Sequence, residues 1–217
     1  MSVVREEFGP TLPELLGSRF GVPARKLWLA LAALGVVALA VVLWLALRPT
    51  PGQADVVVRT PVAFNLAHTD ALRRAAPRAG EMLRLESTAG PPQSFVVHPL
   101  RIGSYKGDVS AELTLMSSRM IDEMRAHYPG FIYRSDGRVN INKQPGYQIV
   151  FQAKVDGRTT YGKRVLLVAG PDPPPHSGLD ITMLAARSAG VPKADAVAAN
   201  GALKTPYRSL RFGTQRP

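Results

Sequence analysis

The feature that most constrains this chain is an uninterrupted apolar run from Leu27 to Leu47. It contains twenty-one residues with no charge, no proline and a single glycine. A helix rises about 1.5 Å per residue, so this run would extend roughly 30 Å, the thickness of the hydrocarbon core of a bilayer. A helix also pairs its own backbone groups, which a segment in lipid must do. We therefore expect a transmembrane helix at 27–47, with the lipid bilayer as its partner.

The flanks of this run are typical of a membrane span. Trp28 and Trp44, the only tryptophans, lie near its two ends, where indole rings prefer the membrane interface. Arg25 and Lys26 precede the run, and Arg48 follows it. Cations beside the first apolar helix favour the cytoplasmic side. The prediction is a single-pass protein of the cytoplasmic (inner) membrane, with its N-terminus in the cytoplasm and its C-terminal domain outside.

Four segments follow from this placement. They are a cytoplasmic tail with a short helix (1–26), the transmembrane helix (27–47), a Pro/Gly linker (48–55) and an extracytoplasmic domain (56–217). Thr11 to Glu14 has the pattern of a capping box, and a mostly disordered leader is the alternative. A signal peptide cleaved near Ala54 is the alternative to a retained anchor, but the apolar run exceeds the usual 7–15 residues of a signal core.

Residues 56–217 combine one helical pattern with several strand patterns. Apolar residues recur every three or four positions from Asp108 to His127, which predicts an amphipathic helix. Alternating segments predict strands at 62–67, 81–86, 94–102, 131–134, 139–142, 147–155, 158–168 and 179–185. Asp-Gly pairs at 136–137 and 156–157 predict hairpin turns. A short helix or turn is expected at 69–76, and a last helix from Pro192 to about Ala199.

Three of these segments carry a likeness to a known family. They are the strand Val62–Ala67, the glycine-turned hairpin Gly146–Val168 and the terminal segment Ser209–Phe212. Their order resembles that of the PsbP-like superfamily, which includes the extrinsic PsbP protein of photosystem II, a Ran-binding nuclear import factor and LpqN-type bacterial envelope lipoproteins. The resemblance implies an α+β domain, an antiparallel sheet covered by helices as an α/β/α sandwich. It also implies non-enzymatic binding or assembly, and it transfers no functional residue.

The chain lacks the residue patterns of an active site. It has no cysteine, which excludes disulfides, a thiol nucleophile and thiolate metal sites. His68, His98, His127 and His176 lie far apart without the i, i+4 spacing of a metal site. No serine lies in a nucleophile elbow, and no glycine loop precedes Lys-Ser/Thr. We expect no enzyme, cofactor or metal, unless folding gathers His98 or His127 with a carboxylate in a cleft.

Positive charge is the strongest anomaly of composition. The net charge is +11, and +10 of it belongs to residues 48–217. The candidate basic binding surface comprises Arg73, Arg74, Arg78, Lys163, Arg164, Lys204, Arg208 and Arg211. Such charge favours an acidic protein partner or an anionic envelope component. A generally basic surface that reflects coding bias is the alternative, and no nucleic acid is expected because no recognition motif is present.

These patterns predict a non-catalytic interaction or accessory domain displayed outside the cytoplasmic membrane. Its mechanism would be surface complementarity, with the basic residues steering the partner. The alternative is a carrier of a small ligand or lipid, held in an apolar pocket between the predicted 108–127 helix and the sheet.

Overall fold

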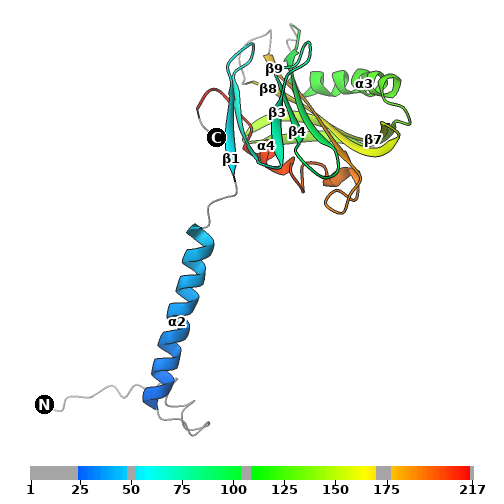
Figure 1. Cartoon of the computed structure of the whole chain (residues 1–217). Coiled ribbons are helices and arrows are strands. Elements are labelled where there is room, and N and C mark those ends of the chain that lie inside the picture. Colours follow the sequence, from blue (N-terminus) through cyan, green and yellow to red (C-terminus); the bar gives the residue numbers. More distant parts are fainter. Residues whose placement is uncertain (1–23, 48–51, 104–108, 170–176, 216–217) are drawn as a thin grey trace, which may run out of the picture. The chain divides into compact units, whose positions relative to one another are not determined.

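The computed structural model describes residues 24–47, 52–103, 109–169 and 177–215 (Figure 1). The chain forms two compact units, residues 1–50 and 51–217. The expected Thr11 cap and Arg48 lie outside the described residues. In the first unit, the helix α2 (Ala24–Leu47) is continuous over 24 residues. Its sequence is dominated by alanine and leucine, which have the highest helix propensities, so the helix is expected on local grounds as well.

The second unit contains two antiparallel sheets. The three-stranded sheet has the order β1-β2-β10, and the seven-stranded sheet has the order β3-β4-β5-β9-β8-β7-β6. The strands are β1 (Gln53–Val58), β2 (Phe64–Thr69), β3 (Leu72–Ala75), β4 (Leu83–Ser87), β5 (Gln93–Arg101), β6 (Ile132–Ile141), β7 (Gln144–Val155), β8 (Arg158–Val168), β9 (Ser177–Ala186) and β10 (Arg211–Phe212). The helical segments are α3 (Val109–His127), the 3₁₀ turn η1 (Ala194–Ala196) and α4 (Lys204–Ser209).

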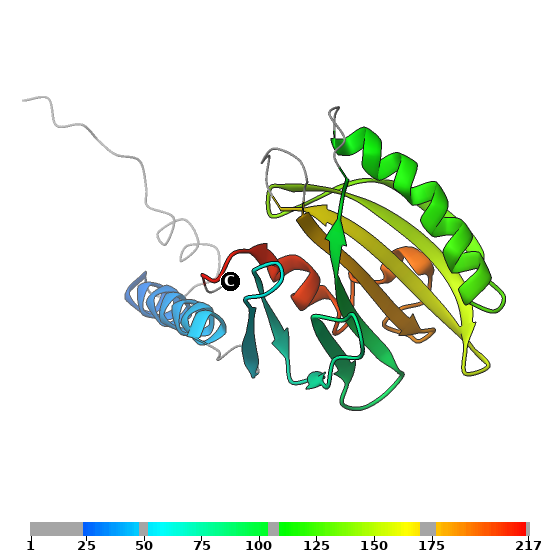
Figure 2. The same cartoon turned by 90° about the horizontal axis from the view of Figure 1, so that it is seen from above.

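The seven-stranded sheet separates two hydrophobic cores. On one face, α3 packs Leu113, Met120 and Met124 against strand residues such as Ile149 and Phe151 (Figure 2). This stripe of α3 is the one that the periodicity predicted. The other face packs against the three-stranded sheet, η1 and α4. The domain is therefore α+β, and much of the layer opposite α3 is a small sheet, whereas the family resemblance implied helices there.

The two glycine-turn predictions have different outcomes. Asp156 and Gly157 form the expected β7–β8 turn, with φ of 49° and 73°. The predicted turn at Asp136-Gly137 is wrong, because both residues lie inside β6 and pair with β7. The Asp136 carboxylate accepts hydrogen bonds from the hydroxyls of Tyr133 at 2.6 Å and Tyr147 at 2.8 Å. These contacts hold the aspartate on the strand, and the chain reverses at residues 142–143.

Two further predictions have different outcomes. Residues 69–76, expected as a short helix or turn, form a tight turn followed by the strand β3, because backbone pairing with β4 is available there. The Thr88 N–H and hydroxyl fix this turn by donating to the carbonyls of Ala71 and Asp70. The helix expected at 192–199 is reduced to η1. Ala198 has a φ of 61°, a left-handed conformation that ends a right-handed helix.

Candidate binding groove

An open groove lies on the sheet face that α3 covers in part. The helix packs against β6 and β7, and the groove lies over the neighbouring strands β4, β5 and β9. It consists of two adjoining hollows that share His98, His127, Tyr128 and Thr182. The α3 hollow has a volume of about 730 Å³ and lies beside the C-terminal end of α3. The β4 hollow has a volume of about 330 Å³ and reaches Arg78 and Arg84.

Strand alternation places the polar lining of the groove. Ser94, Val96 and His98 are alternate residues of β5, so their side chains emerge on the same face. Directly paired residues on antiparallel strands also share a face. The β9 partners of these three residues are Leu184, Thr182 and Asp180, respectively. The intervening Phe95 and Val97 point into the opposite core.

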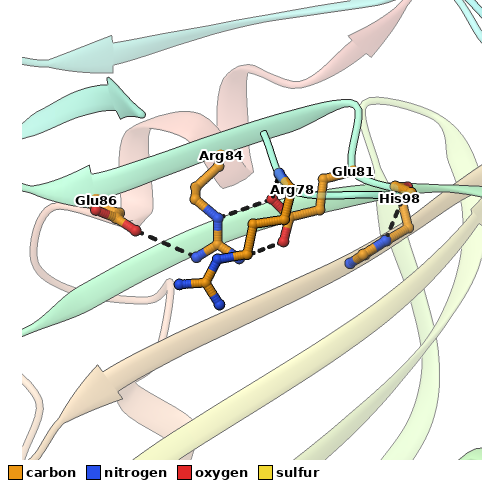
Figure 3. Close-up of polar contacts among 6 residues, drawn as sticks. Arg78, Glu81, Arg84, Glu86 and His98 are labelled. Atoms are coloured by element: carbon orange, nitrogen blue, oxygen red, sulfur yellow. Dashed lines mark hydrogen bonds and ion pairs between the residues drawn. The ribbon is translucent and has the colours of Figure 1, made fainter. Parts of the chain in front are cut away.

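A closed ion-pair network borders the β4 hollow (Figure 3). Glu81 Oε2 accepts from the Arg78 backbone N–H and from Arg84 Nε, each at 2.8 Å, and Oε1 also pairs with Arg84. Arg84 Nη1 lies 3.3 Å from Glu86 Oε1. The Glu81 side chain is only 5% exposed. The hydrogen bond from Arg84 lowers the pKa of Glu81 from 4.5 to about 2, so the carboxylate stays ionised at neutral pH.

A second ion pair lines the α3 hollow. Arg164 of β8 and Asp180 of β9 form a two-point contact, with Nε to Oδ1 at 2.9 Å and Nη2 to Oδ2 at 2.6 Å. Both carboxylate oxygens of Asp180 are thereby occupied. Beside the pair, burial raises the pKa of Tyr128, so its hydroxyl stays protonated at neutral pH.

The fold brings His98 and His127 to one groove, although they are far apart in the sequence. His98 Nδ1 lies 3.1 Å from the Gly80 carbonyl oxygen, which can only accept, so this nitrogen carries the proton. Strand alternation can assign His98 to one face of β5, and helix periodicity can assign His127 to one face of α3. No local sequence pattern, however, predicts that α3 lies beside β5. The nearby Asp180 is engaged by Arg164, and no imidazole–carboxylate hydrogen bond occurs among the described residues.

The first predicted basic cluster lies at the edge of this groove. Arg73 and Arg74 are exposed on the edge strand β3, where consecutive side chains point to opposite faces. Arg73 pairs across from Glu86 and so shares the groove face. Arg78 follows in the β3–β4 connection, is exposed and lines the β4 hollow. The structure therefore unites Arg73 and Arg78 with the groove, and Arg74 points to the other face.

The second predicted cluster is not brought together. Arg164 lines the α3 hollow, whereas the adjacent Lys163 points to the opposite face of β8 and is 7% exposed. Lys163 Nζ lies 5.5 Å from the centre of the Tyr207 ring on α4, and burial lowers the pKa of this lysine. Lys163 therefore contributes to packing beneath α4 more than to a binding surface.

The third predicted cluster is exposed on the far layer of the domain. Lys204 and Arg208 lie on α4, and Arg211 lies on β10. The β6–β7 turn is fixed beside them, because the Asn142 side-chain amide donates to the carbonyls of Arg208 at 2.8 Å and Leu210 at 2.7 Å. This basic surface is separated from the groove by the seven-stranded sheet.

The predicted membrane-boundary residues are described in part. On α2, Lys26 is exposed, and the side chains of Trp28 and Trp44 are 56% and 57% exposed. The Arg25 side chain lies outside the described part. Among the residues whose side chains are described (in α2, Lys26 and 28–44), no helix is long and apolar enough to cross a membrane.

Within the described ranges, no group of three His, Cys, Asp or Glu side chains is arranged to hold a metal ion. Comparison with known proteins gives similarity at the level of the fold only. No family model and no curated protein sequence matches the chain.

Solved structures share the fold of the domain, among them LpqN and a cyanobacterial PsbP protein. LpqN of Mycobacterium tuberculosis, described as involved in cell envelope biogenesis, has a TM-score of 0.53 at 12% identity, covering 74% of this chain and 91% of its own. The cyanobacterial PsbP protein CyanoP of Synechocystis has a TM-score of 0.51 at 9% identity, covering 76% of this chain and 95% of its own. The similarity agrees with the PsbP-like architecture expected from the order of the strands and helices.

Proposed function

We propose that this chain is a membrane-anchored, non-catalytic accessory protein of the cell envelope, which displays its PsbP-like domain outside the cytoplasmic membrane to bind an acidic partner. The observation that carries this proposal is the groove, an open site whose ion pairs are formed within the protein. Three of its carboxylates, Glu81, Glu86 and Asp180, contact arginines of the same domain. A carboxylate held in this way is a poor general base, and the arrangement favours binding over catalysis.

The apolar run Leu27–Leu47 supports the anchor. This run lies within the helix α2. The side chains of residues 28–44 of the run are described, and the uncharged sequence extends past them at both ends. The exposure of its leucine and valine side chains also supports a lipid environment, because large apolar patches on a protein surface mark sites of membrane or protein contact. LpqN, which shares the fold, is described as acting in cell envelope biogenesis, and this supports an envelope location.

The carrier alternative has less support from the packing. Between α3 and strands β7 and β8, the space is filled by Leu113, Met120, Met124 and the strand residues beneath them. A lipid chain would have to displace this core. The groove beside α3 is open and lined largely by polar side chains, which suits a polar partner better than an acyl chain.

The test is crosslinking in native membranes followed by purification of the full chain. Two controls are a chain that ends after residue 50 and a triple variant with Arg73, Arg74 and Arg78 replaced by Gln. A matched triple variant replaces Lys204, Arg208 and Arg211 by Gln. We expect a defined partner that is lost with the domain and weakened by one triple variant. A partner retained by the truncated chain, or none at all, contradicts the proposal.

A further inference from the structure

We propose that the β4 hollow is a carboxylate-binding site, which receives an acidic side chain of a partner protein between Arg78, Ser94 and Thr182. The inference rests on the proposed function and specifies where and how the acidic partner is held. It follows from an imbalance between hydrogen-bond donors and acceptors in the lining of the hollow.

Glu81, the carboxylate that lines the hollow, is already used. Glu81 accepts from the Arg78 backbone N–H and from Arg84, and Glu86 contacts the same guanidinium. The Arg84 side chain is 12% exposed and held by two carboxylates, so it has little capacity for a further ligand. The network thus supplies a rigid wall, and its charges are compensated internally.

The donors of the hollow are free. Among the described residues, the Arg78 guanidinium makes no hydrogen bond or ion pair, and Figure 3 shows its side chain running beside that of Arg84. The hydroxyls of Ser94, Thr182 and Tyr128 line the same hollow and likewise have no partner in the described part of the chain. A hollow with a free guanidinium and free hydroxyl groups can donate to a ligand that only accepts, which is the property of a carboxylate.

His98 lies at the junction of the two hollows, with its Nδ1 directed to the Gly80 carbonyl. Charged and titratable groups around His98 are Glu81, Arg78 and Arg84 from the β4 side, Asp180 and Arg164 from β9 and β8, and His127, Tyr128 and Glu123 from α3. Except for Glu123, the carboxylates of this set are paired with arginines. Arg78 is the cation left to attract an anion.

The hollow is the right size for part of a partner and too open to enclose a whole one. Its volume of about 330 Å³ lies at the lower end of small-molecule sites, which are about 300–1,000 Å³. Arg73 of the edge strand β3 lies on the same face of the sheet and continues the positive charge there. An extended acidic peptide would place one carboxylate in the hollow and others along this edge.

The experiment uses the full chain in detergent micelles and measures the anisotropy of a labelled polyglutamate peptide, with polyserine of equal length as the reference probe. Arg78→Gln retains the backbone N–H that Glu81 needs and removes only the free cation. We expect this variant to bind about tenfold more weakly, the loss typical of one charge-assisted hydrogen bond. Arg78→Lys should recover part of the affinity, because it restores the charge without the planar fork.

The matched control is Arg101→Gln, which removes another exposed arginine, on β5 and outside the hollow. It should change the affinity by less than about twofold, as expected for a screened distant charge. Equal losses in both variants, or no difference between the two peptides, would overturn the proposal. Displacement by succinate as effective as by the peptide would assign the site to free small carboxylates instead. If a membrane partner is captured equally by wild type and Arg78→Gln, the proposed function stands and the carboxylate site is wrong.

Discussion

Glu81 is the residue with the most demanding environment in the groove. Its carboxylate is nearly inaccessible to water, yet it accepts one backbone and two guanidinium hydrogen bonds. A buried charge is tolerated when it is paired and hydrogen-bonded, and removal of one member leaves the others unsatisfied. The network also fixes the β3–β4 connection that carries Arg78, so its integrity determines the geometry of the proposed carboxylate site.

Replacing Glu81 by Gln should therefore reduce the free energy of unfolding by about 1–3 kcal/mol, the cost of unpaired charged hydrogen bonds. Thermal unfolding of the full chain at neutral pH measures it. The matched control is Asp122→Asn, which removes the carboxylate of an exposed α3 ion pair whose side chains are 73% and 59% exposed. This control should cost less than about 1 kcal/mol. Equal effects of the two substitutions would refute a structural role for the Glu81 network.

The same residue predicts a pH dependence of stability. The Arg84 hydrogen bond lowers the pKa of Glu81 from 4.5 to about 2 in the folded chain. As the pH falls, the Glu81 carboxylate is therefore protonated in the unfolded chain before it is protonated in the folded chain. The stabilisation is complete above the unfolded pKa and is lost as the pH falls toward the folded value. Between these two values, wild type should lose more stability than Glu81→Gln. If the unfolding midpoints of wild type and Glu81→Gln fell in parallel as the pH is lowered, the lowered pKa of Glu81 would be contradicted.

Gly162 gives a residue-scale prediction about the core beneath α3. A Cβ at this position would lie 2.2 Å from the ring of Phe151, which is fully buried. Gly162→Ala should destabilise the domain by about 1–3 kcal/mol through overpacking. Gly137→Ala is the control, because a Cβ there meets no atom within 4 Å. Chemical denaturation of both variants tests the prediction, and a neutral Gly162→Ala would show that the Phe151 ring can move.

At the scale of elements, hairpin turns show what local sequence can predict. Asp156-Gly157 was recognised because this pair suits the positive φ of both turn residues. Asn142-Lys143 has the same conformation, with φ of 48° and 70°, but lysine gives no such signal. Tertiary contacts hold this turn: the Asn142 side-chain amide donates to the carbonyls of Arg208, near the end of α4, and of Leu210, just after it. Those contacts exist only once the whole domain has folded.

Lys143→Gly should consequently stabilise the domain by about 0.5–1 kcal/mol, because glycine adopts a φ of 70° without the steric cost of a side chain. The reference is Asn142→Ala, which removes both side-chain hydrogen bonds and should destabilise by about 1–2 kcal/mol. The thermal unfolding midpoints of these two variants, compared with that of wild type, measure both effects. A lowered midpoint for Lys143→Gly would indicate that the lysine side chain contributes contacts that outweigh its backbone strain.

At the scale of the whole molecule, the sequence predicted elements better than their assembly. The spacing of apolar residues located α3 and most strands. A helix with one buried face repeats its apolar residues about every 3.6 positions, and a strand with one buried face repeats them every 2 positions. It could not bring His98, His127 and Arg78 to one groove, because their proximity depends on strand order and on where α3 crosses the sheet. Charge counting also grouped Lys163 with Arg164, whereas strand alternation sends them to opposite faces.

The anchor is the remaining whole-molecule proposal, and it can be tested independently of any partner. The proposed anchor is the uncharged run of 21 residues from Leu27 to Leu47, which as a helix would extend roughly 30 Å, the thickness of a bilayer core. We expect wild type to stay in the membrane pellet after alkaline carbonate extraction, and protease added outside spheroplasts to digest the domain. Replacing Leu34 and Ala38 by Arg places two cations at the centre of the run. Each should cost about 2.5–3.5 kcal/mol of insertion free energy, so the variant should leave the pellet.

The control for this experiment is Leu115→Arg, which adds an arginine at an α3 position that is 68% exposed. It should stay in the pellet like wild type, because an exposed position of a folded domain tolerates charge. Extraction of wild type by carbonate would refute the membrane span, whereas retention of the double-arginine variant would show that another segment holds the protein at the membrane. A digested domain in spheroplasts together with a carbonate-resistant pellet would place the groove where an envelope partner can reach it.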